Sequence, residues 1–442
     1  MAAFSETHDA RPTAGPMLAP VTGGNEVARR SSALLLSVAV MGVGGLAFNA
    51  IAAHLVNTEE FGVQASLFFW VTLVNQLTSM GLPVAVARLS RYSHTLSERP
   101  LLLWSFLYTA ASSVAGAALF FLFAGDRLRP EVRAALHAWG GLAAFLVISG
   151  IVVGFSLALL VEIRLMAVGL GKWVVVRSVL VNIARCGLLL VPALRREPMM
   201  LLVLNAGINA LSGLVGAVIL SVWTRRQPHG PLVPVPRELA PELRFATVNW
   251  LGTVALLGAQ FGFPVIADIT PAQNAAFYLA WQVMAMVFVV PVSVGHVVVS
   301  ETSRGAHHSS RTPFVKGLVL SVSITGLAAA ASFVVAGPLT RLVFGVKYGT
   351  TADVLPIVLT AAVPWCLTSL LLARARADGD GVATVLITSI YGVIVLLVAA
   401  FFTRNDPGQS ANAWLCANAL AAGAAWLASL ARGRRLLHSE VA

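Results

Sequence analysis

The sequence predicts an all-α integral membrane protein of about twelve transmembrane helices in two six-helix lobes. Three observations lead to this prediction. Of the 442 residues, 57% are hydrophobic and only 11% are charged, whereas a soluble globular protein carries about 25% charged residues. The chain contains twelve apolar runs of about the 20 residues that a helix needs to cross a bilayer. A proline-rich loop divides these runs into six and six.

The twelve runs are read as helices because each is unbroken. The strands of a membrane barrel would alternate apolar and polar residues over short segments. The expected N-lobe helices span residues 32–53, 63–87, 101–123, 139–160, 173–193 and 199–223. The expected C-lobe helices span residues 248–267, 275–299, 314–336, 354–372, 382–402 and 413–430.

The remaining segments are expected to be tails and loops. Residues 1–30 are polar and rich in Pro, Gly and Thr, and they lack the pattern of a cleavable signal peptide, so we expect a disordered cytoplasmic tail. Residues 31–224 are expected to form the N-lobe, 225–246 a cytoplasmic Pro-rich linker, 247–432 the C-lobe and 433–442 a second cytoplasmic tail.

The basic residues predict the orientation, because cytoplasmic loops of membrane proteins collect Lys and Arg. With the N-terminus inside, 21 of the 30 Lys and Arg residues fall in inside segments, eight fall outside, and Arg185 falls within a helix. We therefore expect a bacterial inner-membrane protein with both termini in the cytoplasm. The net charge of +11 is then explained by basic loops that face anionic lipids, and no nucleic-acid partner is expected.

The two halves are expected to be an internal repeat of the parallel type. Six helices per half is an even number, so both halves enter the membrane in the same direction. Residues 164–171 (RLMAVGLG) match residues 374–381 (RARADGDG) at four of eight positions, with a constant offset of 210.

Arg185 is the sharpest candidate for a functional residue. It lies roughly 18 Å from the cytoplasmic end of its predicted helix at about 1.5 Å per residue, too deep to reach the surface easily. Ser178, Asn182 and Arg185 share one helix face by their spacing. Two roles remain open: a cationic stripe that meets an anionic substrate, or a side chain that holds neighbouring helices through backbone carbonyls.

Other polar side chains recur at helical spacing in the predicted spans. A single one more often bonds a neighbouring helix, but together they predict a hydrophilic lumen. Arg88, at the inner end of the second helix, is either a topology anchor or a phosphate contact. The candidate substrate-binding residues are Arg185, Asn182, Arg88, Gln76, Asn49, Asn249, Gln260, Gln282 and His296. The same stripes also contain Thr72, Asn205, Asn209 and Thr253.

Several classes of function are disfavoured. The chain has no P-loop and no HExxH or GxSxG motif, and its loops are too short for a catalytic domain. No Asp or Glu lies near the middle of a predicted span, where an ion-coupled pump usually places one. The spacing of the three cysteines fits no metal site. We expect no enzyme activity, no cofactor and no bound metal.

Three stretches carry a resemblance to a known family. They are residues 59–63 (EEFGV) with the helix exit 81–88 (GLPVAVAR), residues 276–280 (AFYLA), and residues 348–357 (YGTTADVLPI) with the exit 373–381 (ARARADGDG). Their order and spacing resemble the multidrug/oligosaccharidyl-lipid/polysaccharide exporter superfamily, and within it the polysaccharide flippase (Wzx-like) branch. Many members carry an Asp partway along the seventh helix, where this chain has residues 261–263 (FGF).

The resemblance implies a MATE-like fold and a flippase. The expected substrate is a polyprenyl-diphosphate-linked oligosaccharide for surface or exported polysaccharide (exopolysaccharide) synthesis. It would be moved by alternating access of the two lobes around a cationic, polar cavity. The expected partners are this lipid-linked glycan and anionic lipids at the cytoplasmic face. A monomer is favoured, and work beside a polymerase or glycosyltransferases is left open.

Three alternatives stay open on the sequence. A small-molecule exporter of the MATE-type branch would share the fold, but the first helix lacks the carboxylate expected there. A major-facilitator transporter would carry a G-x-x-x-D-R-x-G-R-R-like loop, and residues 88–100 (RLSRYSHTLSERP) do not fit. A membrane glycosyltransferase or polymer ligase would need a large external loop with catalytic residues.

Overall fold

The computed structural model describes residues 24–79, 98–124, 128–167, 170–224, 247, 250–304, 311–403 and 405–441, and every regular element within them is a helix. The N-terminal half contains α1 (Gly24–Leu55), α2 (Thr58–Thr78), α4 (Glu98–Ala124), α5 (Pro130–Ala138), α6 (Gly141–Ala167), α7 (Gly171–Leu189), η3 (Pro192–Arg195), α8 (Pro198–Leu202), η4 (Val203–Gly207) and α9 (Ile208–Thr224). The C-terminal half contains η5 (Val254–Gly258), α11 (Ala259–Ala267), α12 (Pro271–Arg304), α13 (Arg311–Val343), η6 (Val346–Tyr348), α14 (Gly349–Thr360), α15 (Ala362–Ala377), α16 (Gly381–Phe402) and α17 (Pro407–Val441).

The predicted class, an all-helical protein of many membrane spans, is confirmed. Within the described residues, ten spans are long and apolar enough to cross a membrane. α2 and α7, of 21 and 19 residues, pack among these ten but carry more polar side chains. With them the count is the predicted twelve.

Some helix boundaries differ from those predicted. α1 begins at Gly24, inside the segment assigned to the N-terminal tail, and α17 continues to Val441, through the segment assigned to the C-terminal tail. Hydropathy marks only the apolar part of a helix, and the backbone hydrogen bonds continue past it into polar sequence. The other tail residues and the 225–246 linker lie outside the described ranges.

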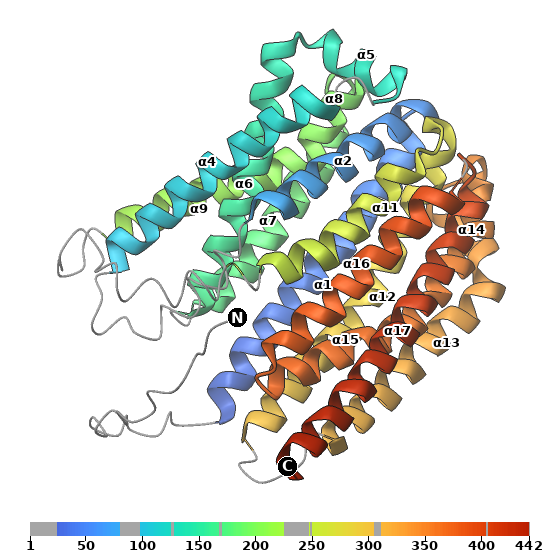
Figure 1. Ribbon diagram of the computed structural model, residues 1–442. Coiled ribbons are helices and arrows are strands. Elements are labelled where there is room, and N and C mark those ends of the chain that lie inside the picture. Colours follow the sequence, from blue (N-terminus) through green and yellow to red (C-terminus); the bar gives the residue numbers. More distant parts are fainter. Residues whose placement is uncertain are drawn as a thin grey trace.

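The helices form two groups that touch at one end and diverge toward the other (Figure 1). In the first group α1 packs on α7, and α6 packs on α4 and α9. In the second, α12 packs on α13, α14 and α15, while α16 packs on α11 and α17. α2 joins the groups, because it packs on α4 and α8 within its own lobe and on α11 and α12 of the other.

The end where the lobes touch, residues 54–66 and 268–278, is called the sealed end below. There the Asn274 side-chain amide donates to the Ser66 hydroxyl (2.8 Å) and to the Gly62 carbonyl (3.3 Å). Arg129 forms an ion pair with Asp268 at 2.7 Å. These contacts cross between the lobes, so the structure is closed at this end.

Gly62 is required for that closure. A Cβ atom at Gly62 would lie only 1.6 Å from the Pro271 carbonyl oxygen. No side chain fits in that space, so the start of α2 approaches α12 more closely than any other residue type would permit.

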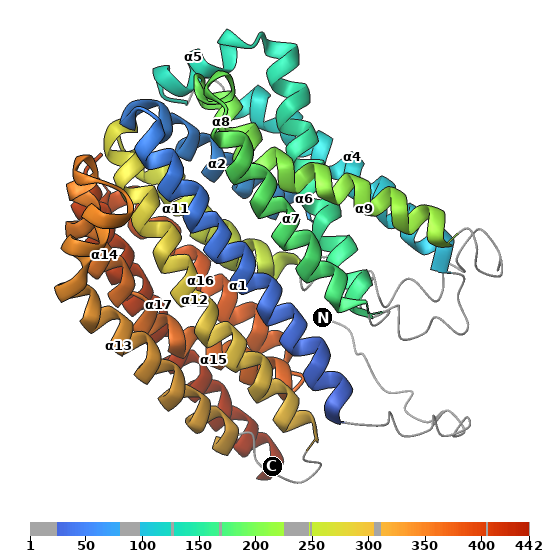
Figure 2. The same cartoon turned by 180° about the vertical axis from the view of Figure 1, so that it is seen from behind.

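The opposite end is called the open end below. α1 begins there and α17 ends there, and the reverse view shows the two groups of helices apart at this end (Figure 2). The interlobe contacts of Arg129 with Asp268 and of Asn274 with α2 lie at the sealed end. Nearer the open end, the Trp250 indole donates to the Leu77 carbonyl at 3.1 Å, so the last turn of α2 also contacts the C-lobe. The conformation is therefore closed at one face and open at the other.

The predicted internal repeat is visible element by element. α12, α13, α16 and α17 each begin about 210 residues after α2, α4, α7 and α8, as expected of a parallel repeat. Arg164 lies in the last turn of α6 and Arg374 in the last turn of α15. Gly171 and Gly381 are the first residues of the helices that follow.

Candidate functional site

Two cavities lie between the lobes, on the open side of the seal. The N-lobe cavity has a volume of about 460 Å³ and is lined mainly by α1 and α12, with Arg185 of α7 and Asn205 of η4 also in its wall. The C-lobe cavity has a volume of about 750 Å³ and is lined mainly by α11, α12 and α15. Phe68, Gln282 and Val289 line both, so the cavities adjoin along α12.

Arg185 lies in the wall of the N-lobe cavity and is only 5% exposed. Its Nη1 donates to the Asn205 side-chain oxygen at a long 3.5 Å, and its Nη2 donates to the Met41 carbonyl at 3.3 Å. Its Nε has no hydrogen-bond partner. None of the ion pairs formed by the described residues includes Arg185. The site thus holds a buried cation with a spare donor.

Amide and hydroxyl groups surround the cation. Asn205 receives the Arg185 bond and donates its own amide to the Tyr278 hydroxyl at 3.2 Å. The Asn49 and Gln64 side chains adjoin the same hydroxyl. Asn49 is 1% exposed and its side-chain oxygen lacks a hydrogen-bond partner. Five different elements, α1, α2, α7, η4 and α12, meet in this cluster.

A π-helical turn positions Asn205. η4 interrupts the span that α8 and α9 otherwise complete, and Asn205 is its central residue. Such single turns are rare and occur often at functional sites, because the extra residue turns a side chain away from the regular helical face. The corresponding C-lobe span contains a second π-helical turn, η5, whose Leu256 and Leu257 line the C-lobe cavity.

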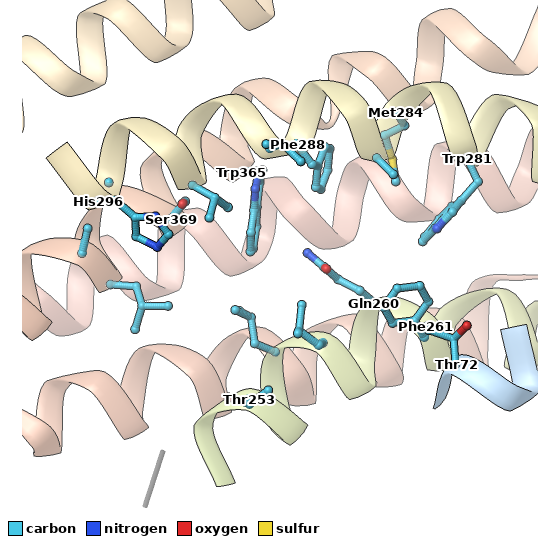
Figure 3. Close-up of a pocket in the computed structure, with 18 of the residues that line it drawn as sticks. Thr72, Thr253, Gln260, Phe261, Trp281, Met284, Phe288, His296, Trp365 and Ser369 are labelled. Atoms are coloured by element: carbon cyan, nitrogen blue, oxygen red, sulfur yellow. The ribbon is translucent and has the colours of Figure 1, made fainter. Parts of the chain in front are cut away.

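The C-lobe cavity is mostly apolar, with a few polar groups (Figure 3). Gln260 extends from α11 between the aromatic side chains of Trp281 and Trp365, and its amide lies 3.5 Å from the Tyr391 hydroxyl. His296 and Ser369 lie together nearer the open end. Two aromatic side chains of the wall pack on each other, since Phe288 stacks on Trp365 at 5.4 Å between ring centroids.

Some of the predicted site residues line a cavity and others do not. Arg185 and Asn49 line the N-lobe cavity, Gln260 and His296 line the C-lobe cavity, and Gln282 lines both. Asn182 is not among the lining residues: its amide donates to the Val40 carbonyl at 2.9 Å, so it joins α7 to α1. Gln76 is half-buried on α2 and lines neither cavity. Arg88 and Asn249 lie outside the described residues.

The structure adds residues that the sequence prediction did not select. In the sequence, Tyr278 belongs to one of the family-like stretches, and Gln64 lies outside the predicted polar stripes. Asn205 and Asn209 lay in a predicted polar stripe, but nothing in that stripe distinguished them from helix-packing amides. Arg376 was assigned to a cytoplasmic loop, whereas it lies on α15 and lines the C-lobe cavity. Only the tertiary arrangement places these residues with Arg185 or beside His296.

Neither described cavity lining contains Asp or Glu. Groups of three or more His, Cys, Asp and Glu side chains that could hold a metal ion are absent from the described ranges. The side chains that line the N-lobe cavity include the guanidinium group of Arg185, which can bind an anion, and amides and a hydroxyl, which can bind hydroxyl groups.

Solved structures share this fold. No family model matches the chain, and no curated protein matches its sequence. A multidrug resistance MATE family transporter of the MOP superfamily is similar in its inward-facing conformation, with a TM-score of 0.64, 15% identity and coverage of 91% of this chain and 99% of that one. In the outward-facing conformation of such a transporter the TM-score is 0.59 at 15% identity, with coverage of 92% and 95%.

The lipid II flippase MurJ, in an inward closed conformation, has a TM-score of 0.67 at 13% identity. The match covers 90% of this chain and 87% of that one. At these identities the likeness establishes the fold, which is the MATE-like fold predicted from the sequence.

Proposed function

We propose that the protein is a flippase that moves a polyprenyl-diphosphate-linked oligosaccharide across the bacterial cytoplasmic membrane. The substrate would serve the synthesis of a surface or exported polysaccharide. The two lobes would rock about a central cationic cavity, so that the cavity faces first the cytoplasm and then the outside. Among the structures with this fold, MurJ is described as a lipid II flippase.

The main support for the proposal is that Arg185 is buried without a carboxylate partner among the described ion pairs. Burying a guanidinium without a carboxylate partner costs several kcal/mol of desolvation, of order 3 kcal/mol or more. A protein that needed only a helix contact would be more stable with an apolar side chain there. A diphosphate would supply the missing charge, and Nε and the two Nη atoms present the planar geometry that phosphate oxygens accept.

The neighbouring groups fit a glycan head group. The Asn49 oxygen and the Asn209 oxygen are buried acceptors without partners, and sugar hydroxyls would donate to them. Gln282 lies where the two cavities adjoin. A head group larger than the N-lobe cavity would therefore extend along α12 into the C-lobe cavity.

The conformation fits substrate uptake from the cytoplasm. The distribution of Lys and Arg predicts that the chain ends lie inside, and the two groups of helices are apart at the end where α1 begins and α17 ends. The seal would then lie at the outer face. In this orientation the structure is the state that accepts substrate.

The test is a gene deletion combined with mass spectrometry of lipid-linked oligosaccharides. We expect the intermediate to accumulate and the surface polymer to disappear in the deletion strain. Wild type should restore normal levels of the intermediate and of the surface polymer. Arg185→Ala at normal abundance should restore less than about a tenth of the polymer. Arg185→Lys should restore an intermediate amount, because it keeps the positive charge but loses the planar set of N–H donors. Unchanged lipid-linked intermediates in a strain without a redundant homologue would contradict the proposal.

A small-molecule exporter is the second candidate, and the C-lobe cavity favours it. That cavity is predominantly apolar and aromatic, as drug-sized ligands require, and one structure with this fold is described as a multidrug resistance transporter. Under this alternative, deletion would raise sensitivity to lipophilic compounds and leave the polymer unchanged. Gln260→Ala would then impair export more than Arg185→Ala.

A further inference from the structure

A separate hollow lies on the N-lobe between α7 and α9, with α6 beneath it. We call it the lateral groove and define its walls by residues 173–184 of α7 and 208–220 of α9. Its volume is about 690 Å³, and its lining is almost entirely apolar. Leu180 and Leu211, which line it, are 60% and 57% exposed.

Arg177 is the one charged side chain in the groove wall, and a carboxylate neutralises its charge. Arg177 forms an ion pair with Glu162 of α6, and its Nη1 donates to the Ser212 hydroxyl at 3.0 Å. This arrangement ties α6, α7 and α9 together beneath the groove. The groove therefore offers a ligand apolar contact and no unbalanced charge, which suits a hydrocarbon chain.

The inner end of the groove adjoins the cationic cavity. On α7, Ala184 lines the groove and the next residue, Arg185, lines the N-lobe cavity. On the partner span, Ile208 lines the groove and the next residue, Asn209, lines the cavity. Consecutive residues on both helices thus face the two spaces at the same depth, so a single amphiphile can occupy both.

The groove runs from this inner end toward the open end. Residues 173–184 extend about 16 Å at about 1.5 Å per residue, which is about half of a ~30 Å hydrocarbon core. Where the groove ends toward the open end, Lys172 lies over the Trp173 ring, with 5.8 Å between its Nζ and the ring centroid, an arrangement typical of the membrane interface. The groove thus connects the interface with mid-depth of the bundle.

We infer that the lateral groove binds the isoprenoid chain of the substrate whose diphosphate is bound at Arg185. This inference rests on the proposed function. An ordinary phospholipid would place an acyl chain along the groove with its head group at the interface, level with Trp173, so its head group would not reach Arg185. A lipid whose head group is held at Arg185 must lead its chain out at that depth, and the groove begins there.

The test uses a photoreactive probe on the purified full-length protein in nanodiscs. The probe is a polyprenyl diphosphate with a diazirine in its chain, and peptide mass spectrometry locates the label. We expect label on α7 and α9 within the groove, displaced by unlabelled polyprenyl diphosphate and not by phosphatidylglycerol. Leu180→Trp should fill the groove and lower this labelling by about fivefold or more.

Ile183→Trp is the matched control. Ile183 is on the same helix, is 64% exposed and does not line the groove. Its substitution should leave the labelling unchanged. Label spread evenly over the lipid-facing helices, equal displacement by phosphatidylglycerol, or no effect of Leu180→Trp would each overturn the inference.

Arg185→Ala separates this inference from the proposed function. If the probe binds saturably and depends on Arg185 but the label lies elsewhere, the groove assignment alone fails. If wild type binds no probe saturably, both fail. If groove labelling is unaffected by Arg185→Ala, the joint binding of head and chain is overturned.

Discussion

At the scale of single residues, the neighbours decide what a polar side chain does. The spacing of Asn182 and Arg185 predicts one shared helix face. In the structure both donate to backbone carbonyls of α1, but only Arg185 also lines the cavity. The difference follows from length, since the guanidinium extends past the helix contact and the amide does not.

Asp380 provides a residue-scale prediction outside the spans. Its carboxylate accepts from the Ala383 N–H at 2.9 Å, which caps α16, and from Arg432 of α17 at 2.6 and 2.8 Å. Partial burial would raise the pKa of Asp380, but the hydrogen bonds from Arg432 and Ala383 outweigh it and hold the pKa below its ordinary value.

Because the folded-state pKa is depressed, this stabilisation is present above the unfolded-state pKa and is lost as the pH falls through the folded-state value. Asp380→Asn keeps a side chain that can cap α16 but removes the ion pair with Arg432, so it should lower the melting temperature at pH 7. The two melting temperatures should converge only as the pH falls below the ordinary Asp pKa of about 3.9 and through the lower folded-state pKa. A difference that stays the same from pH 7 down to about pH 2, measured by thermal denaturation in detergent, would contradict this assignment.

At the scale of the elements, glycines set how closely helices approach. A Cβ at Gly213 of α9 would lie 2.2 Å from the Gly154 carbonyl oxygen of α6 and 2.6 Å from the Ala158 nitrogen. These atoms are backbone and cannot move aside. Membrane helices depend on such close packing, because lipid offers no hydrophobic drive for their association.

Gly213→Ala should therefore destabilise the N-lobe by about 1–3 kcal/mol. Gly150 of α6 is the matched control, because a Cβ there meets nothing within 4 Å. Gly150→Ala should leave the melting temperature unchanged or raise it slightly. Thermal unfolding monitored by size-exclusion chromatography distinguishes the two, and equal melting temperatures for both variants would refute the packing argument.

At the scale of the whole molecule, the sealed end should govern which face the cavity opens to. Ser66→Cys with Asn274→Cys, joined by a short thiol cross-linker, should fix the lobes as they stand here, since these side chains touch at 2.8 Å. Spin labels at Leu103 and Val315, near the starts of α4 and α13, report the separation at the open end. We expect one long distance after cross-linking and a second, shorter population before it.

The control links two residues of the same lobe at the same face. Trp139 donates to the Glu197 carboxylate at 2.7 Å, and both belong to the N-lobe. Cross-linked cysteines at these positions should leave both distance populations intact. A shorter population that persists after the Ser66–Asn274 pair is linked would show that the seal does not control the opening.

Hydropathy and the positions of Arg and Lys determine the class, the twelve spans and the two lobes, because the bilayer requires about 20 apolar residues for each crossing. They also single out Arg185, since a cation at that depth is exceptional in any membrane helix. These conclusions depend only on the order of residues along one chain. They need no knowledge of which helices are neighbours.

The tertiary structure alone decides which polar side chains share a space. Arg185, Asn205 and Tyr278 come from three helices, and nothing in their local sequences distinguishes them from amides and hydroxyls that only bridge helices. The π-helical turn at Asn205 and the close approach at Gly62 result from packing between helices. The spacing of side chains along one helix shows which of them share a face of that helix. A binding site requires that the polar faces of several helices meet in one space, and the packing of the helices within and between the lobes decides which faces meet.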